Sequence, residues 1–209
     1  MVNTQGAFIA IEGAEGSGKS SVISYLQEQF PEIVFTREPG GTPYAEHIRE
    51  VMVHSEHTHE GDPLTFMLLV FASRRVHILR RIIPALAQGK TVVTDRFAAS
   101  SWAHNLRNME SVDAEKLFYE LHKHVVGEVI PHYIFLDIDP ILGLERKKQQ
   151  RTQNDGRTDH FEQQTVDFHV RSYLGYKEFL TQTPHTIIDA TQPLQAVCLD
   201  VQKTIKSLL

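Results

Sequence analysis

A glycine-rich stretch near the start of the chain carries the residue types that phosphate chemistry needs. Residues 13–20 read Gly-Ala-Glu-Gly-Ser-Gly-Lys-Ser and fit the pattern G-x-x-x-x-G-K-[ST]. Glycines let the backbone fold so tightly that successive N–H groups face one anion, while Lys19 can reach the β- and γ-phosphates and Ser20 can bind Mg²⁺. A Gly/Ser-rich turn is the alternative, but it would not need Lys-Ser at its end. We therefore expect a nucleoside triphosphate site formed by Gly13, Ala14, Glu15, Gly16, Ser17, Gly18, Lys19 and Ser20.

Two arginines further along the chain can form a second anion site. Arg37 stands in Thr-Arg-Glu-Pro-Gly-Gly-Thr and Arg96 in Thr-Asp-Arg-Phe, each directly after an apolar run. If both runs are parallel strands, both arginines lie at the same edge of the sheet as the glycine-rich stretch. Two guanidinium groups there can hold the phosphate of an acceptor, and Asp95 can act on Mg²⁺ directly or through water. A surface salt bridge is the alternative for each arginine.

Residues 145–157 form a basic segment in a chain that is acidic as a whole. The segment contains five basic and two acidic side chains. Almost none of its residues is apolar, so it cannot belong to the core. Phosphoryl transfer needs a cover that keeps water away from the γ-phosphate. We expect a lid at about residues 146–158, with Arg146, Arg151 and Arg157 as its arginines.

The surrounding sequence alternates short apolar runs with helical patterns. The run at residues 7–11 predicts a buried strand directly before the glycine-rich stretch, and apolar residues at helical spacing follow as far as Pro31. Residues 64–87 repeat the helical pattern with Leu79 on its apolar face, and further strands are expected from Val34 and at residues 91–94, 132–136 and 186–188. Strands that alternate with helices predict an α/β fold of three layers, a five-stranded parallel sheet flanked by helices, in a single domain over residues 1–209.

The composition excludes several classes of protein. The chain has 209 residues with 26 acidic and 21 basic side chains, a net charge of −5, which argues against general binding of nucleic acids. Its single cysteine, Cys198, rules out a disulfide framework within the chain. The longest apolar stretch is too short to cross a membrane and the start of the chain is unlike a signal peptide, so we expect a cytoplasmic protein. His54, His57 and His59 lie in a polar segment that fits a loop better than a metal site.

A phosphate-binding loop occurs in several classes of protein, which the rest of the sequence separates. A signalling GTPase would carry an N-K-x-D segment that reads guanine, and this sequence has none. A motor or a helicase would need a longer chain and a large partner surface. A small kinase needs a second anion site facing the loop and a lid. The two arginines and the basic segment meet both needs.

At this point the order of the motifs resembles the thymidylate kinase family, in its bacterial form. After the glycine-rich stretch come Thr-Arg-Glu-Pro-Gly-Gly-Thr, Leu-Leu-Val-Phe-Ala-Ser-Arg-Arg, Pro-Ala-Leu-Ala-Gln-Gly-Lys, Asp-Arg-Phe and Ile-Asp-Ala-Thr-Gln-Pro-Leu. The resemblance runs from about Phe8 to the end of the chain. It implies an enzyme that transfers the γ-phosphate of ATP to dTMP and forms dTDP, with Mg²⁺ as cofactor and a homodimer as its assembly.

The resemblance also implies roles for individual residues. Arg37 and Arg96 match the arginines that bind the acceptor phosphate, and Glu15 matches an acid near the sugar 3′-hydroxyl. Phe71 matches an aromatic ring that stacks on thymine, with packing in the core as the alternative, and Arg75 matches the side chain that addresses the base edge. The implied ATP site gains Gln192, and the implied dTMP site comprises Glu15, Arg37, Pro39, Phe71, Arg75, Arg96, Ser100, Ser101, His104 and Asn105.

Members of the bacterial form supply from the lid an arginine that their phosphate loop lacks. The loop here has none either, so a lid arginine is expected to act on the transferring group, and the catalytic set becomes Lys19, Arg37, Asp95, Arg96 and one of Arg146, Arg151 and Arg157. The chain departs from the family at His104, where a tyrosine is frequent, at His160, where an arginine is usual, and in the short stretch after Asn105. Another nucleotide or deoxynucleoside kinase is the nearest alternative, and a nucleotide-binding protein without transfer activity is the second.

Overall fold

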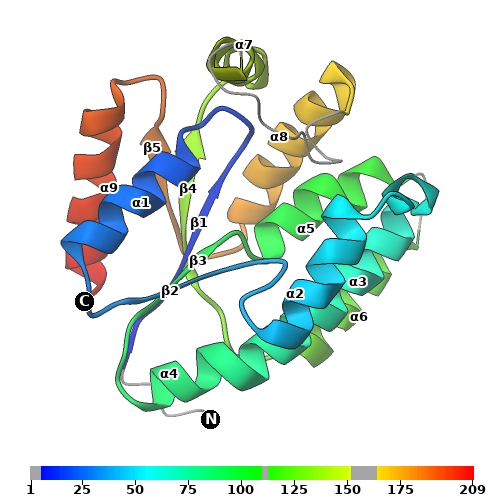
Figure 1. The fold of residues 1–209 in the computed structure, drawn as a ribbon, viewed down its shortest axis with the longest axis horizontal. Coiled ribbons are helices and arrows are strands. Elements are labelled where there is room, and N and C mark those ends of the chain that lie inside the picture. Colours follow the sequence, from blue (N-terminus) through cyan, green and yellow to red (C-terminus); the bar gives the residue numbers. More distant parts are fainter. Residues whose placement is uncertain (1–5, 110–112, 152–163) are drawn as a thin grey trace.

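Five strands form one parallel sheet in the computed structural model, which describes residues 6–109, 113–151 and 164–209 (Figure 1). Neighbouring strands run in the same direction, as the pairing of Phe8 with Val92 and of Tyr133 with His185 shows. The sheet has the order β2-β3-β1-β4-β5, and the predicted parallel sheet is thereby confirmed. The strands are β1 (Phe8–Gly13), β2 (Val34–Arg37), β3 (Val92–Asp95), β4 (His132–Asp137) and β5 (His185–Asp189).

Helices connect the strands and cover both faces of the sheet. Side-chain oxygens of Thr42, Asp62 and Thr165 accept hydrogen bonds from N–H groups in the first turns of three helices, which fixes where these helices begin. Over the described ranges, no helix is long and apolar enough to cross a membrane. The helices are α1 (Lys19–Gln29), α2 (Pro43–Arg49), α3 (Pro63–His77), α4 (Ile83–Ala87), α5 (Ala98–His104), α6 (Ala114–Val125), α7 (Pro140–Arg151), α8 (Val166–Leu180) and α9 (Leu194–Leu208).

The long helix expected at residues 64–87 is present, with one change of phase. A π-helical stretch, Ile78–Ile82, joins α3 to α4, so the helical run continues from Pro63 to Ala87. Because a π-turn contains more residues than an α-turn, it rotates the apolar stripe around the helix axis. Ile78 and Ile82 remain buried, but Leu79, which the pattern placed on the apolar face, is 44% exposed.

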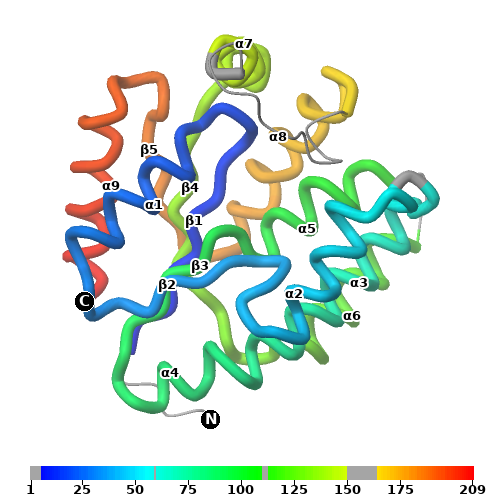
Figure 2. The backbone as a smooth tube through the Cα atoms, in the orientation of Figure 1, coloured from blue at the N-terminus to red at the C-terminus, as the bar shows by residue number. Residues whose placement is uncertain are grey.

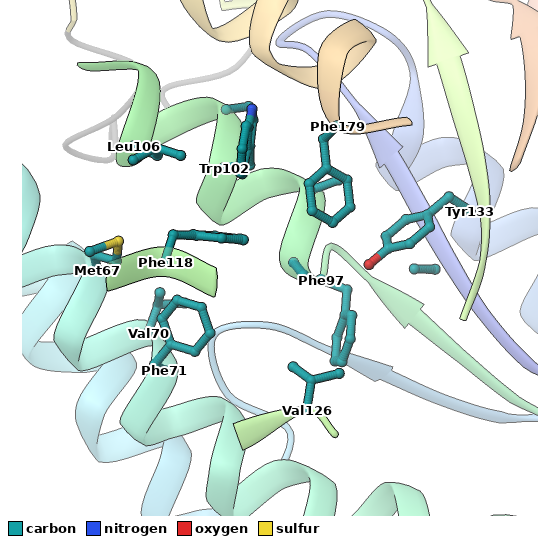
Figure 3. Close-up of a cluster of buried hydrophobic side chains, with 14 of the residues drawn as sticks. Met67, Val70, Phe71, Phe97, Trp102, Leu106, Phe118, Val126, Tyr133 and Phe179 are labelled. Atoms are coloured by element: carbon teal, nitrogen blue, oxygen red, sulfur yellow. The ribbon is translucent and has the colours of Figure 1, made fainter. Parts of the chain in front are cut away.

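Helices α1 and α9 lie on one face of the sheet, and α3, α5, α6 and α8 lie on the other (Figures 1 and 2). Each face has its own hydrophobic core. Side chains alternate along a strand, so Ile9 and Ile11 of β1 pack beneath α1 and α9, while Phe8 and Ala10 point to the opposite face. The larger core lies on that opposite face, among α3, α5, α6 and α8, and is rich in aromatic rings (Figure 3). The three-layer α/β architecture predicted from the sequence follows from these two cores.

Helix α7 rests directly on the glycine-rich turn that follows β1. A Cβ atom built at Gly143 would lie 2.1 Å from the carbonyl oxygen of Glu15, and one built at Gly16 would lie 1.9 Å from the carbonyl oxygen of Gly143. Only glycine at both positions permits this approach of two backbones. The first turns of the expected lid segment therefore belong to a helix that is packed against the phosphate-binding loop.

Candidate active site

The glycine-rich turn leaves the N-terminus of α1 open to a ligand. Gly16 and Gly18 have φ values of 72° and 81°, in the left-handed region that favours glycine. Gly18 precedes α1 and makes no side-chain cap, and the hydroxyl of Ser17 is buried without a hydrogen-bond partner in the described structure. N–H groups at a helix start bind anions, and an unpaired hydroxyl adds a further donor.

A pocket surrounds this turn, and we call it the phosphate pocket. Five cationic side chains and three carboxylates line it, so its walls carry a surplus of positive charge. Residues from β2, β3, α2 and α7 close its sides. Its lining consists of Ala14, Glu15, Gly16, Ser17, Gly18, Lys19, Ser20, Ser21, Arg37, Glu38, Arg49, Asp95, Arg96 and Lys147.

Lys19 and Asp95 form an ion pair within the phosphate pocket. The Nζ atom of Lys19 lies 2.6 Å from Oδ1 of Asp95. Burial opposes ionisation of Asp95, but the charges of Lys19 and Arg96 outweigh it and lower the pKa of this carboxyl. Asp95 is therefore a charged oxygen donor beside the lysine of the loop.

Ser20 and Asp95 both line the phosphate pocket and together suit a magnesium ion. A hydroxyl and an ionised carboxylate are ligands that Mg²⁺ accepts, and this ion usually completes its coordination with waters and substrate phosphates. Among the residues described, no group of three or more His, Cys, Asp or Glu side chains could hold a metal alone. The donor set thus fits an ion that is shared with a bound nucleotide.

Arg37 and Arg96 lie at the same edge of the sheet and in the same pocket. Arg37 ends β2, is half exposed, and its Nη2 lies 2.8 Å from Oε2 of Glu46. Arg96 follows β3 and is largely buried, and its φ of 68° makes it the non-glycine residue with a left-handed backbone among those described. This unusual conformation turns its guanidinium back over the start of the glycine-rich turn, where Nη1 lies 3.4 Å from the carbonyl oxygen of Gly13.

A second pocket adjoins the first, and we call it the acceptor pocket. The two pockets share Glu15, Glu38, Arg49 and Arg96, so a molecule in one lies next to a molecule in the other. Most of the remaining wall residues are aliphatic or small polar side chains from α3, α5 and the π-helical stretch Glu50–His54 that follows α2. Those walls are formed by Pro39, Met52, Val53, Val70, Arg74, Phe97, Ser100, Ser101, His104 and Asn105.

Arg74 of α3 lines the acceptor pocket, and two of its three guanidinium nitrogens have hydrogen-bond partners. Its Nε atom donates to Oε2 of Glu38 at 2.6 Å, and its Nη2 atom donates to Oγ of Ser101 at 2.8 Å. Its Nη1 atom is buried and has no hydrogen-bond partner in the described part of the chain. A buried donor without a partner costs about 1–3 kcal/mol, which makes Nη1 a candidate donor to a ligand in this pocket.

Comparison with known proteins identifies the family of this chain. The family model of thymidylate kinases matches residues 11–201. The chain belongs to the thymidylate kinase family. It is 35% identical to the thymidylate kinase of Shouchella clausii over 98% of this chain and 97% of that one. Its identity to the thymidylate kinase of Caulobacter vibrioides is 37%, over 97% of both chains.

Most side chains that the resemblance to thymidylate kinases assigned to the acceptor line one or both of the two adjoining pockets. Glu15 and Arg96 line both pockets, and Arg37 lines the phosphate pocket. His104, one of the departures from the family, also lies at the wall of the acceptor pocket. The other members that line it are Pro39, Ser100, Ser101 and Asn105.

Phe71 and Arg75 line neither pocket, so the structure does not bring them together with the other residues expected to bind dTMP. Phe71 is 2% exposed and packs edge-on against Phe118 in the larger core, with ring centroids 5.4 Å apart (Figure 3). Arg75 is exposed, and its Nη1 atom lies 3.4 Å from the carbonyl oxygen of Val125. Successive residues of a helix point about 100° apart, so the preceding pair, Val70 and Arg74, faces the acceptor pocket.

The expected lid arginines fall into two groups. Arg146 of α7 donates to the carbonyl oxygens of Ala190 and Thr191, at 2.7 and 2.9 Å, and thus faces the loop after β5 rather than the glycine-rich turn. The side chain of Arg151, and Arg157 and His160 as a whole, lie outside the described residues. In the loop after β5, Gln192 donates to the carbonyl oxygen of Asp189 at 3.1 Å.

Three basic residues at the pockets were missed by sequence reasoning. Lys147 of α7 pairs with Glu15 and lines the phosphate pocket, while Arg49 lines both pockets and its Nη1 donates to the carbonyl oxygen of Pro39 at 3.1 Å. The role at the base edge was assigned to Arg75 and not to the neighbouring Arg74. The basic character of residues 145–157 was a signal for Lys147, and the adjacent pair of arginines at 74 and 75 was a signal for Arg74, whereas Arg49 did not stand out from ordinary surface arginines.

Proposed function

We propose that this chain phosphorylates dTMP to dTDP with ATP as the phosphate donor, as a step in the supply of dTTP. The observation that carries the proposal is the pair of adjoining pockets that share Arg96 and Glu15. One pocket is built on a phosphate-binding loop, and the other is lined by Arg74, whose Nη1 has no hydrogen-bond partner among the described residues. A donor and an acceptor bound side by side around Arg96 are positioned for direct transfer.

In this proposal the ATP phosphates lie on the glycine-rich turn. The N–H groups at the start of α1, the Ser17 hydroxyl and Lys19 bind them. Ser20 and Asp95 would hold Mg²⁺ shared with the nucleotide, and the ion would reduce the negative charge of the phosphates. Gln192 is assigned to the nucleotide end of the same site.

The acceptor lies with its phosphate toward Arg37 and Arg96 and its base toward Arg74. Two guanidinium groups align the attacking phosphate oxygen with the γ-phosphate, and no general base is needed because this oxygen is already ionised. Arg74 Nη1 donates to a carbonyl oxygen of the base. Val70, Met52 and Val53 provide an aliphatic wall for a flat ring, and Glu15 accepts a hydrogen bond from the sugar 3′-hydroxyl.

The chain acts as one kinase domain in the proposed function, with residues 146–158 as its lid. Lys147 adds a cation to the phosphate pocket from the described part of this segment. Arg151 or Arg157 remains the proposed arginine for the transferring group, because Arg146 is engaged with the loop after β5. We further propose a cytoplasmic homodimer, which light scattering tests through the molar mass in solution.

A coupled assay of ADP release tests the reaction and its acceptor together. Purified protein is supplied with ATP and Mg²⁺ and with dTMP, dUMP, dCMP, dGMP or thymidine in turn. The proposal predicts the highest kcat/KM with dTMP and no turnover in Lys19→Ala. Equal rates with all acceptors, or a clear preference for another one, would identify a different nucleotide kinase. Binding of ATP without transfer to any acceptor would identify a nucleotide-binding protein without kinase activity.

A further inference from the structure

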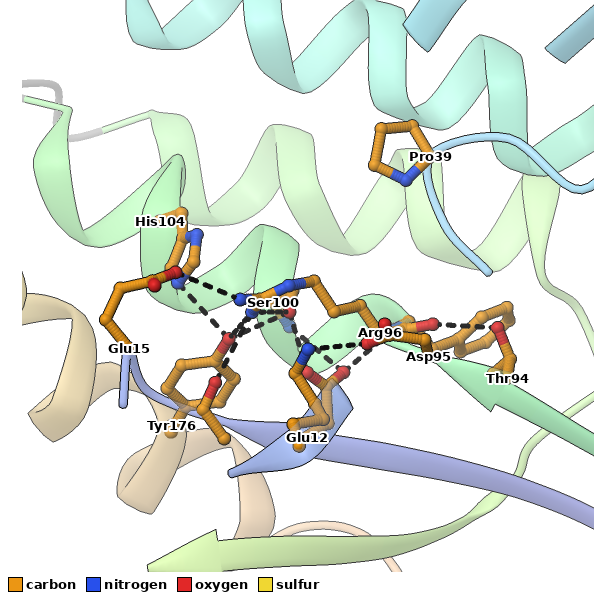
Figure 4. Close-up of polar contacts among 12 residues, drawn as sticks. Glu12, Glu15, Pro39, Thr94, Asp95, Arg96, Ser100, His104 and Tyr176 are labelled. Carbon is orange, nitrogen blue, oxygen red and sulfur yellow. Dashed lines mark hydrogen bonds and ion pairs between the residues drawn. The ribbon is translucent and has the colours of Figure 1, made fainter. Parts of the chain in front are cut away.

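A network of buried and half-buried polar groups contacts Arg96 and ends on helix α8 (Figure 4). The hydroxyl of Tyr176 lies 2.8 Å from Nη1 of Arg96, 2.8 Å from Oγ of Ser100 and 3.2 Å from Nε2 of His104. Tyr176 is 0% exposed and lines neither the phosphate pocket nor the acceptor pocket. It can therefore affect a ligand only through the side chains that it contacts.

Arg96 depends on side-chain partners because its backbone conformation is unfavourable. A left-handed φ in a non-glycine residue costs on the order of 1–3 kcal/mol and persists only where the surroundings hold it. The N–H of Arg96 donates to the carbonyl oxygen of Ile11 at 3.0 Å, which fixes the turn. Among the hydrogen bonds of the guanidinium with the described residues, those with Gly13, Glu15 and Ser100 are 3.1–3.5 Å long, and the one with Tyr176 is the shortest, at 2.8 Å.

The hydrogen atoms of this network can be assigned consistently. Arg96 can only donate, so the oxygen of Tyr176 accepts from it. Burial raises the pKa of Glu12 to about 7, and above that pH the Ser100 hydroxyl donates to Oε2 of Glu12 at 2.6 Å, so that Tyr176 donates to Ser100. The Nε2 atom of His104 in turn carries a hydrogen and donates to Tyr176. The Tyr176 oxygen thus uses its one hydrogen and both lone pairs, which fixes its place between Arg96, Ser100 and His104.

Helix α8 carries a glycine that permits this contact. A Cβ atom at Gly175 would lie 3.0 Å from Cα of Ala103, on α5, and 2.8 Å from Cγ of Arg107. Glycine inside a helix costs about 1 kcal/mol relative to alanine, so it is retained here for the close approach of α8 to α5. That approach brings the hydroxyl of the next residue, Tyr176, to Ser100 and His104.

We propose that Tyr176 is a positioning residue for the acceptor: its hydroxyl holds the Arg96 guanidinium at the junction of the phosphate and acceptor pockets. The inference rests on the proposed function, in which Arg96 binds the acceptor phosphate. Without the hydroxyl, the guanidinium keeps its longer contacts and gains freedom to leave the junction. Binding of the acceptor should then be weakened more than binding of ATP, because the glycine-rich turn and Lys19 bind ATP without help from Tyr176.

The test compares Tyr176→Phe with Tyr173→Phe in the full-length protein. Tyr173 lies one turn earlier on α8, and its hydroxyl donates to Oδ1 of Asp137 at 2.9 Å, outside both pockets. Steady-state rates are measured with dTMP varied at saturating ATP, and with ATP varied at saturating dTMP. We expect Y176F to lose about 10- to 100-fold in kcat/KM for dTMP while its KM for ATP stays within about twofold, and Y173F to keep both values within about twofold.

Three results would overturn the proposal. One is a Y176F enzyme whose kcat/KM for dTMP stays within about twofold of the wild type, and another is an equal loss toward ATP and dTMP. A wild type that does not phosphorylate dTMP refutes the proposed function itself, and the role of Tyr176 falls with it.

If Y176F is too unstable for rate measurements, calorimetric titration with dTMP at low temperature replaces them. A Kd for dTMP unchanged from the wild type would then reject the proposal, and a Kd raised by about 10-fold or more would support it.

Discussion

Arg74 and Glu38 form a buried ion pair at the inner wall of the acceptor pocket, with Nε of Arg74 2.6 Å from Oε2 of Glu38. Each side chain is 1% exposed. His77 approaches the same carboxylate from the other side, with Nδ1 2.9 Å from Oε1. Since a buried charge is stable only with well-placed partners, the pair holds the guanidinium in one orientation. The remaining nitrogen, Nη1, has no hydrogen-bond partner among the described residues, and we propose that it donates to the base of the acceptor.

Arg74→Lys is expected to weaken acceptor binding while leaving the fold intact. Lysine keeps a cation beside Glu38 but has no second nitrogen to donate to the base. The KM for dTMP should rise about 30- to 100-fold, because a site built for a hydrogen bond discriminates strongly when the bond is lost. Arg75→Lys is the matched control and should leave KM within about twofold. If the control raised KM as much as Arg74→Lys, the assignment of the base edge to Arg74 would be wrong.

Phe71→Ala is expected to lower stability rather than acceptor affinity. The ring lies in the larger core against Phe118, so its removal leaves a cavity there. Phenylalanine-to-alanine changes in a core cost about 3–5 kcal/mol in the free energy of unfolding. Urea denaturation measures this loss, and calorimetric titration with dTMP below the melting temperature measures affinity. A variant of unchanged stability with a strongly raised Kd would restore Phe71 to the acceptor site.

The contrast between these neighbours shows where sequence reasoning ends. Parallel strands follow from the apolar runs, and the ends of such strands lie at one edge, so Arg37 and Arg96 could be placed together. On α3, by contrast, one side of the helix faces the core and the adjacent side faces the pocket. Val70 and Phe71 are both apolar, and Arg74 and Arg75 are both basic, so hydrophobic periodicity does not separate them.

Contacts between distant elements set the other limit. Lys147 and Tyr176 belong to α7 and α8, far along the chain from the residues they touch. The basic segment at residues 145–157 indicates a role for Lys147 but not its partner, and no local motif marks Tyr176. Their positions depend on how closely two helices approach the sheet and α5. Two glycines set these approaches, Gly143 at the glycine-rich turn and Gly175 at Ala103. A glycine in a helical pattern indicates that another segment approaches the helix closely, but it does not identify that segment.

Lys147→Met is expected to slow phosphoryl transfer. Lys147 lines the phosphate pocket and pairs with Glu15, whose pKa is about 2 because the charges of Arg96, Lys147 and Lys19 outweigh the effect of burial. Loss of this cation should lower kcat by about 10-fold, since it reduces the positive charge near the transferring group. Lys148, next on α7, is exposed and lines neither pocket, so Lys148→Met should keep kcat within about twofold. Equal losses in both variants would point to a general effect of charge on α7.

His122 should make the fold less stable as the pH falls. Burial, with the nearby charge of Arg74, lowers the pKa of His122 from 6.5 to about 4. Between these values the unfolded chain binds a proton that the folded chain does not, so the free energy of unfolding falls as pH decreases. His122→Gln removes this contribution. The free energy of unfolding is measured by urea denaturation at about pH 7.5 and at about pH 5. Between these pH values it should fall further for the wild type than for H122Q, by on the order of 1–2 kcal/mol. Equal losses would mean that His122 is protonated in the folded protein.

A crystal structure with dTMP bound tests the central claim most directly, namely that the acceptor spans the space between Arg74 and Arg96. The account predicts a carbonyl oxygen of the base within hydrogen-bond distance of Arg74 Nη1. It also predicts the phosphate between Arg37 and Arg96, facing the glycine-rich turn. A base bound away from Arg74, or a phosphate that does not contact Arg96, would contradict it.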